Sequence, residues 1–274
     1  MIRLLPGARR DRGGNALVQL GSRGAESGRR LVICPLDEPG YVVGQVRNDG
    51  YLTLRRVPGQ VAPLFDQEIE GQRVTIYSVR GSIPGVVAVR SIHLTRGRNA
   101  PSEIPFSVDD AYVDVGAESS AVVARLGIRV LSPVTLTKHP HRYGQSLMAA
   151  PVAGRRAACA ALLQAAHQSR LRAKLIPSVM VAFAVQHRLS ERGLAVLATT
   201  AGPFSETLMV DGRPGPLGSP GRVDPDTTSR PKSLGRVAEW TLPVRFAGTA
   251  VETVSLADAD SLRDALVRWI GGQQ

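Results

Sequence analysis

The feature that most restricts the fold is a run of short β-rich segments between residues 41 and 137, separated by Gly and Pro. Closely spaced strands of this kind are typical of a compact antiparallel barrel. Asn48-Asp49-Gly50, between the first two segments, is a strong hairpin signal, because tight hairpins need residues that accept positive φ. A short helix is predicted at Ser119–Leu126, ended by Gly127. The predicted strands are Tyr41–Val46, Tyr51–Val57, Arg73–Ser78, Gly85–Val89, Ala111–Val115 and Val134–Thr137.

The segments on either side alternate strands with helices. Residues 30–36 form a continuous apolar run, which suits a strand buried on both faces of a sheet. Arg155–Leu171 is rich in Ala and Leu, and Asp258–Ile270 has apolar residues at helical spacing, so both are predicted helices. Further strands are expected at 15–20, Val179–Val185, Thr207–Val210 and Trp240–Phe246, a helix or strand at Gly193–Thr199, and a loop at Gly212–Lys232. The alternation predicts an α/β domain with a central sheet, built from residues 1–36 and 140–274, with a β-barrel inserted at 37–139.

The formal net charge is +11, from 34 basic and 23 acidic residues. All the basic residues except Lys138, Lys174 and Lys232 are arginines, and these are scattered singly or in pairs. Surfaces that track single-stranded nucleic acid usually interleave aromatic side chains for base stacking, but only 4% of this chain is aromatic. The composition therefore argues against a nucleic-acid partner.

Cellular location and redox state are predicted from two further features. No apolar run reaches the length of a membrane span, and residues 1–12 contain no apolar segment of signal-peptide length, so a cytoplasmic protein without a membrane segment is expected. The two cysteines, Cys34 and Cys159, each lie in an apolar run. They are predicted to be buried, reduced thiols.

Short motifs occur in a fixed order along most of the chain. They are Asp11-Arg12-Gly13-Gly14-Asn15, Asp37-Glu38-Pro39-Gly40, residues 110–117, Leu126-Gly127-Ile128, Pro133-Val134, residues 159–163, Val185-Gln186, Arg192-Gly193, Val210-Asp211, residues 243–246 and Val251-Glu252. As an ordered set they resemble peptidase family forty-two, the glutamyl and tetrahedral aminopeptidases, which use two metal ions. The resemblance implies a mixed-sheet, zinc-aminopeptidase-like α/β domain interrupted by a β-barrel dimerisation domain.

The same resemblance implies that most of the metal ligands are absent. A dinuclear site needs roughly five His, Asp or Glu ligands and a carboxylate base. Relative to the family's motifs, Pro35 stands at the first His, Gly154 at the bridging Asp, Gln186-His187-Arg188 at the Gln-Glu-Glu segment, and Gly248 at the last His.

Two acidic residues remain at these positions, Asp211 as a ligand type and Asp37 as an orienting carboxylate. Arg155 and Arg188 would add positive charge, and a unit charge repels a cation by about 4 kcal/mol at 4 Å with an effective dielectric near 20. No intact metal site and no cofactor are therefore expected. The resemblance also implies a trimmed α/β layer, because the family's leading helix is not found and the segment between Asp211 and Pro243 is short.

Other residues suggest competing chemistry, each beside a simpler interpretation. His187, with Asp211 or Asp37, is a weak candidate for a general base, and the simpler interpretation is a tolerated polar residue. His139 and His141 could bind a metal weakly, and the simpler interpretation is a solvated turn. Cys34 is a conceivable nucleophile, against inert packing in an apolar strand. Arg155-Arg156 at a helix start opposes the helix dipole, which suggests anion binding, against an ordinary surface position.

The sequence thus predicts a catalytically inactive aminopeptidase homologue that acts as a structural or protein-interaction subunit. Its expected partners are copies of itself, through the inserted barrel, or another protein in a hetero-assembly. The alternative is an active peptide hydrolase with a rearranged site.

Overall fold

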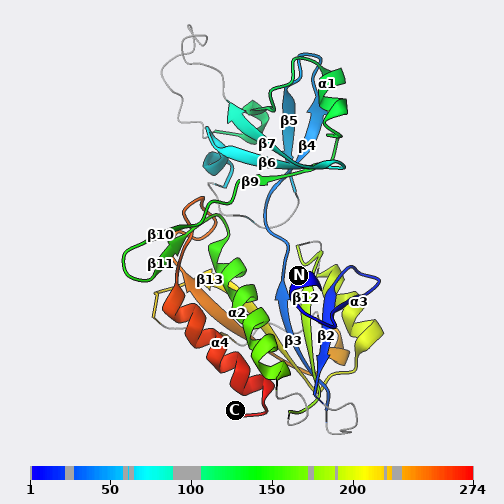
Figure 1. The fold of residues 1–274 in the computed structure, drawn as a ribbon, viewed down its shortest axis with the longest axis vertical. Coiled ribbons are helices and arrows are strands. Elements are labelled where there is room, and N and C mark those ends of the chain that lie inside the picture. Colours follow the sequence, from blue (N-terminus) through cyan, green and yellow to red (C-terminus); the bar gives the residue numbers. More distant parts are fainter. Residues whose placement is uncertain are drawn as a thin grey trace. The chain divides into compact units, whose positions relative to one another are not determined.

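The computed structural model describes residues 2–21, 28–57, 61, 65–88, 106–171, 176–188, 191–218, 221–223 and 230–273. The chain divides into two compact units (Figure 1). The first contains Met1–Glu38, Pro140–Ala247 and Val251–Gln274, and the second contains Pro39–His139 and Gly248–Ala250. The second unit is therefore an insertion that interrupts the chain of the first.

A seven-stranded mixed sheet forms the centre of the first unit, in the order β1-β2-β12-β3-β13-β15-β14. Strands β12, β3, β13 and β15 are parallel, whereas β2 and β14 run antiparallel to their inner neighbours. A small antiparallel sheet contains β10, β11 and β16. The strands are β1 Arg9–Arg10, β2 Ala16–Leu20, β3 Arg30–Pro35, β10 His141–Tyr143, β11 Leu147–Ala149, β12 Val179–Ala184, β13 Glu206–Pro214, β14 Gly221–Val223, β15 Arg236–Val244 and β16 Thr253–Ser255.

Helices cover both faces of this sheet. The α-helices are α2 Ala153–Arg170, α3 Arg192–Ala201 and α4 Leu256–Ile270, and the 3₁₀ helices are η1 Ile2–Leu4 and η6 Lys232–Leu234. Helices α2 and α4 lie side by side (Figure 1) and share one apolar core with the sheet. The segment left open as helix or strand is α3, because Leu194, Leu197, Ala198 and Ala201 fall on one helical face and pack in a second core.

The second unit is a closed six-stranded barrel in the order β4-β5-β8-β7-β6-β9. Gly50 forms the predicted hairpin turn, where φ is +89° and an added Cβ would lie 1.9 Å from the carbonyl oxygen of Ala117, so only glycine fits. The Ser119 hydroxyl accepts the Val122 N–H and begins the predicted helix. The elements are β4 Tyr41–Val46, β5 Leu52–Arg56, β6 Arg73–Ser78, β7 Gly81–Ala88, β8 Tyr112–Asp114, β9 Pro133–Leu136, α1 Ser120–Arg125, η2 Phe65–Ile69 and η4 Val108–Asp110.

The mixed α/β fold and the closed barrel are confirmed. Strands β1, β10, β11 and β16 were not predicted, and three of the expected segments differ from the structure. Strand β7 begins at Gly81, not Gly85, and tolerates Pro84 because that part of β7 pairs only with β6; Val89 lies outside the described residues. Strand β15 begins at Arg236, not Trp240. The predicted loop at Gly212–Lys232 was wrong in part, because β13 continues to Pro214 and β14 pairs with β15.

The prediction of reduced thiols was also wrong. Cys34 at the end of β3 and Cys159 on α2 form a disulfide. Their Cα atoms are 5.5 Å apart, which is the ordinary separation for such a bond. Helix α2 packs over β3 in the shared core, and this contact, which the sequence does not reveal, brings the two side chains together.

Among the described helices, none combines the length and apolar character that crossing a membrane requires.

Loss of the disulfide should destabilise the protein. The bond closes a loop with a sequence separation of 125 residues, so its removal frees the unfolded chain. We expect the double variant Cys34→Ala/Cys159→Ala to lose about 2–4 kcal/mol of unfolding free energy, measured in urea. The wild type under strong reductant should lose stability in the same direction. Free thiols in the unreduced, denatured wild type would contradict the disulfide.

Candidate functional site

The carboxyl ends of three parallel strands meet at one edge of the first unit's sheet. Ala184 of β12 pairs with Pro35 of β3, and Met209 of β13 pairs with Ile33, which places Asp211 level with Pro35. Ligand sites of open α/β sheets form outside such strand ends. This edge is therefore the candidate site.

A buried ion pair joins helix α2 to strand β13 at this edge. Nε of Arg155 donates to Oδ1 of Asp211 at 2.8 Å and Nη2 donates to Oδ2 at 2.6 Å. The two side chains are only 15% and 13% exposed. Burial opposes the charge of Arg155, but Asp211, with Asp37 and Glu252, outweighs burial and raises the pKa of the guanidinium. Both oxygens of Asp211 are thus engaged by one fixed cation.

Asp37 serves the backbone of the neighbouring loop. Its carboxylate accepts the N–H of His187 at 3.0 Å and that of Arg188 at 2.7 Å, just after β12 ends. The carbonyl oxygen of Asp37 also accepts a hydrogen bond from Nη1 of Arg155. Asp37 therefore holds the loop after β12 in place and connects it to the Arg155–Asp211 pair.

His187 lies in the same cluster. Its Nδ1 is 3.9 Å from Oε1 of Glu191, which also accepts a hydrogen bond from Arg230 at 3.2 Å. Burial lowers the pKa of His187, and the charge of Arg155 lowers it further, while Glu191, Asp211 and Asp37 act in the opposite direction. The imidazole is consequently neutral near pH 7.

Gly154, at the position of a bridging ligand in the resemblance, is a packing position in this fold. A Cβ on Gly154 would lie 2.3 Å from Cγ1 of Val244 and 3.1 Å from Cα of Gly212. Its N–H donates to Oε1 of Glu252 at 2.7 Å. A Cβ on Gly212 would in turn lie 2.5 Å from the carbonyl carbon of Gly154. The start of α2 therefore packs backbone to backbone against β13, which leaves no room for a carboxylate side chain.

Left-handed backbone conformations border the site. Val152 before α2, Gln186 after β12 and Glu191 before α3 have φ values of 58°, 56° and 53°. Such conformations cost roughly 1–3 kcal/mol each and are rare for a β-branched residue such as Val152. The loops around the site are thus held in unusual shapes by their surroundings.

The Asp11–Asn15 motif anchors both ends of the loop between β12 and α3. Asp11 accepts hydrogen bonds from the backbone N–H and the amide group of Asn15 at 2.9 and 2.7 Å. Asn15, fully buried, accepts the Val185 N–H at 3.0 Å and donates to the Gly193 carbonyl at 2.9 Å. A Cβ on Gly193 would lie 1.9 Å from the Val185 carbonyl oxygen, so this contact requires glycine. The motif joins the end of β12 to the start of α3.

Comparison with known proteins identifies the family. The sequence profile of the M42 glutamyl aminopeptidase family matches residues 14–213. The chain belongs to the M42 peptidase family. Among curated relatives, "Putative aminopeptidase SgcX" of Escherichia coli is 30% identical over 187 residues, and "Glutamyl aminopeptidase" of Lactococcus lactis is 33% identical over 117 residues. These matches cover 68% and 42% of this chain. They span 48% of the length of SgcX and 31% of the length of the L. lactis protein. The chain thus matches no more than about half the length of either relative.

Solved structures share the fold of this M42 chain. The TET1 peptidase of Pyrococcus horikoshii superposes with a TM-score of 0.82 at 20% identity, over 96% of this chain and 88% of that one. The aminopeptidase APDkam598 of Desulfurococcus kamchatkensis gives a TM-score of 0.81 at 18% identity, over 99% of this chain and 86% of that one. The TET1 peptidase can assemble into a tetrahedron or a large octahedral shell.

The side chains at the candidate site do not fit a pair of metal ions. Asp211 is saturated by Arg155 and by the N–H of Gly212, and Asp37 by two backbone N–H groups. Within the described ranges, no three or more His, Cys, Asp or Glu side chains form a group that could hold a metal ion. An added divalent cation would also meet the charge of Arg155.

The structure brings together Asp37, Arg155, His187 and Asp211 from the sequence-based candidates and leaves others apart. His139 and His141 are exposed, and His141 stacks on Tyr143. Cys34 is closed in the disulfide and offers no thiol. The anions beside Arg155-Arg156 are the chain's own carboxylates, since Arg156 pairs with Glu38 at 2.9 Å. Glu191, Gly212 and Glu252 were not predicted as part of the site.

Replacement of Arg155 should destabilise the protein far more than replacement of its neighbour. Arg155→Ala leaves the Asp211 carboxylate buried without its cation, which should cost about 3 kcal/mol of unfolding free energy. Arg156, whose side chain is 49% exposed, is the matched control, and Arg156→Ala should cost at most about 1 kcal/mol. Arg155→Lys should fall between the two, because it keeps the charge and loses the paired hydrogen bonds. Equal losses for both alanine variants, measured in urea, would contradict this role.

The neutral His187 should make stability depend on pH. Its pKa is lowered below the ordinary 6.5 in the folded protein, so the unfolded chain binds the proton first as the pH falls. This contribution to stability is fully present at pH values above the pKa of His187 in the unfolded chain. It is lost progressively as the pH falls from that value to the pKa of His187 in the folded protein. Unfolding free energy should therefore be lower at about pH 5 than at about pH 7.5, and His187→Gln should reduce the difference. His141→Gln, at an exposed position, should leave it unchanged.

Proposed function

We propose that this M42 chain is a catalytically inactive aminopeptidase homologue that acts as a structural or protein-interaction subunit of an oligomer or larger complex. The observation that carries the proposal is the Arg155–Asp211 pair. Asp211 is the one residue of ligand type that remains among the positions implied by the resemblance, and both of its oxygens bind Arg155. A guanidinium occupies the place of the cations and supplies no bound water for attack.

The surrounding geometry supports the loss of dinuclear chemistry. A carboxylate at residue 154 would have to displace the buried side chain of Val244 and the backbone of Gly212. A divalent metal ion about 4 Å from Arg155 would be repelled by about 8 kcal/mol at an effective dielectric near 20, since two unit charges repel by about 4 kcal/mol there. The fold around the site thus favours an internal ion pair over metal binding.

Assembly is proposed from a structural neighbour and from the barrel surface. The P. horikoshii peptidase can assemble into a tetrahedron or an octahedral shell, and the family resemblance assigns dimerisation to the barrel. Among its described residues, the barrel exposes five large apolar side chains, Tyr77, Val79, Val86, Val130 and Leu131. Exposed apolar residues on a folded unit are suited to a protein interface. A second copy of the chain or another protein would bury them.

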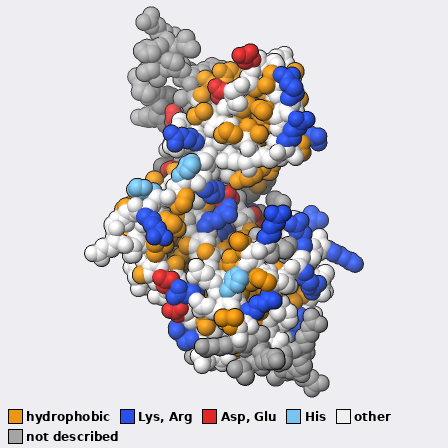
Figure 2. Space-filling view, viewed as in Figure 1, with side chains coloured by type: hydrophobic (Ala, Val, Ile, Leu, Met, Phe, Trp, Pro, Cys, Tyr) orange, Lys and Arg blue, Asp and Glu red, His pale blue; other side chains and the backbone are white. Residues whose placement is uncertain are grey.

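Three expectations stay predictions: a trimmed α/β layer, a cytoplasmic location and the lack of a nucleic-acid partner. The trimmed α/β layer is implied only by the resemblance, through the family's leading helix and the short segment between Asp211 and Pro243. A cytoplasmic location was expected from the sequence, although a disulfide persists more readily in an oxidising compartment. For nucleic acid, Figure 2 shows Lys and Arg side chains in separate groups on the face drawn, and no single basic stripe.

A second candidate function is peptide hydrolysis with a rearranged site. The observation that favours it is the buried His187 with a lowered pKa and Nδ1 3.9 Å from Glu191. A neutral imidazole beside a carboxylate can accept a proton from water. His187 would be the base, with Asp211 or Asp37 shaping the charge around it.

One set of measurements on the purified full chain distinguishes the two candidates. We expect elemental analysis to give no stoichiometric zinc, cobalt or manganese, and native mass spectrometry to give an oligomer, alone or with a partner chain. An aminopeptidase panel with and without added metal should stay at background across pH, with an active M42 enzyme assayed in parallel as the positive control. Two metal ions per chain would contradict the proposal. Hydrolysis that disappears in His187→Ala would establish the second candidate.

A further inference from the structure

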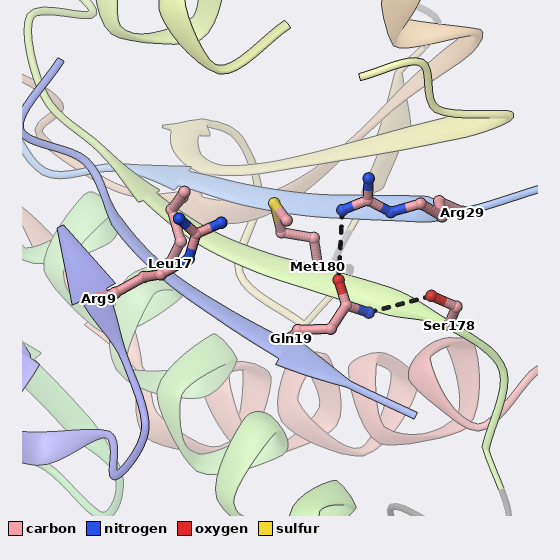
Figure 3. Close-up of a pocket in the computed structure, with 6 residues that line it drawn as sticks. All are labelled: Arg9, Leu17, Gln19, Arg29, Ser178 and Met180. Atoms are coloured by element: carbon pink, nitrogen blue, oxygen red, sulfur yellow. Dashed lines mark hydrogen bonds between the residues drawn. The ribbon is translucent and has the colours of Figure 1, made fainter. Parts of the chain in front are cut away.

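A cavity lies on one face of the same sheet and begins at the amino ends of β3 and β12. It has a volume of about 410 Å³ and is lined by Arg9, Leu17, Gln19, Arg29, Ser178 and Met180 (Figure 3). Arg29 and Ser178 precede β3 and β12, whereas the candidate site follows the carboxyl ends of these strands. Leu17 and its partner Arg9 lie level with Ala182 of β12, so the cavity extends along the strands toward their carboxyl ends. Its lining shares no residue with the Arg155–Asp211 site.

Strand register places the lining residues on one face of the sheet. Leu17 and Gln19 are two apart in β2, and Arg9 and Met180 are their cross-strand partners, respectively. Because side chains alternate along a strand, these four point to the same side. Leu17 and Met180 belong to the core under α3, so this is the face that α3 partly covers. Figure 3 shows Met180 between the ends of Arg9 and Arg29.

The polar groups of the cavity are held in position. Nη1 of Arg29 donates to the carbonyl of Ala201, at the end of α3, at 2.8 Å. Nη2 of Arg29 donates to Oε1 of Gln19, whose amide group donates to the Ser178 hydroxyl at 3.1 Å (Figure 3). The Arg29 guanidinium lies over the ring of Phe204, 5.5 Å from its centroid. These contacts fix Arg29 and use two of its five N–H groups.

The charges of the cavity are not balanced. None of the six lining residues is acidic. Among the residues that the structure describes, none forms an ion pair or hydrogen bond with the Arg9 guanidinium. Other arginines of this unit, such as Arg155, Arg213 and Arg236, pair with carboxylates of the chain. Two positive charges therefore face a cavity whose described lining residues supply no anion.

We propose that this cavity binds a small molecule that carries a carboxylate or phosphate group. The guanidinium groups of Arg9 and Arg29 would donate to its oxygens, since planar guanidinium matches both groups. The Ser178 hydroxyl is a further donor, and Leu17 and Met180 form an apolar floor for the rest of the ligand. A volume of about 410 Å³ lies within the usual range for small-molecule pockets, roughly 300–1,000 Å³, which favours a small ligand over an acidic polypeptide.

Isothermal titration calorimetry on the full chain tests this assignment. The probes are benzoate and phenyl phosphate, which share an aromatic ring and differ in the anion, with benzyl alcohol as the uncharged control. We expect one of the two anions to bind with one site per chain and the alcohol not to bind. The preferred anion distinguishes a carboxylate ligand from a phosphate ligand.

Strand β1 offers a matched control for charge. Arg9 pairs with Leu17 on the cavity face, whereas the adjacent Arg10 pairs with Ala16, which belongs to the core on the opposite face. Arg9→Ala should weaken anion binding about tenfold or more, because a hydrogen bond to a charged group is worth about 1.5–3 kcal/mol. Arg10→Ala removes the same charge and should change the affinity less than about twofold. Arg29→Lys keeps the charge but loses the planar, bidentate guanidinium, so it should also weaken binding. Circular dichroism checks that each variant is folded.

Three outcomes would overturn the proposal. The first is the absence of measurable heat with both anions. The second is equal weakening in Arg9→Ala and Arg10→Ala, which would indicate general attraction to a basic surface. The third is binding of polyglutamate without binding of either small anion, which would assign the arginines to an acidic polypeptide.

Discussion

The ion pair between Arg155 and Asp211 determines the architecture of the candidate site. Acidic groups converge there because parallel strands end at one edge, and Asp37, Asp211 and Glu252 all act on Arg155. Carboxylates gathered with little access to water require a cation. A positive side chain at the start of a helix is otherwise unfavourable, because it meets the positive end of the helix dipole. The carboxylates reverse that balance, so the same guanidinium neutralises them and fixes the start of α2 on β13.

The residues around the site have two kinds of role in this M42 chain. Asp11, Asn15 and Gly193 hold backbone segments together, and their contacts are all present. The positions that the family resemblance implies for metal ligands contain a close-packed glycine, an arginine and a histidine. Backbone anchoring depends on the fold alone, whereas metal ligands matter only where a metal binds. Under the proposed function, this difference explains how the fold can be kept while the ligand set is replaced.

The fold was predictable from the sequence to a greater extent than the site. Apolar runs at strands β3 and β12 and the turn signal at Gly50 specify local structure, and local signals were enough for the α/β layer and the barrel. The Arg155–Asp211 pair joins residues 56 positions apart, and the Cys34–Cys159 bond joins residues 125 apart. Such pairings depend on the tertiary contact of α2 with the sheet, which no local pattern encodes. Strand β14 was missed for the same reason. Its Gly and Pro neighbours indicate a loop, and the strand forms only because it pairs with the edge of β15.

The disulfide has a consequence for the covalent path through the molecule. All the barrel strands lie within the loop that Cys34 and Cys159 close, so the chain is a ring carrying two tails. A pulling force applied to residues before Cys34 and after Cys159 would pass through the sulfur atoms and bypass the barrel strands. The barrel would stay mechanically unloaded while the α/β unit is stretched. The α/β unit can therefore yield without transmitting tension along the backbone to the barrel.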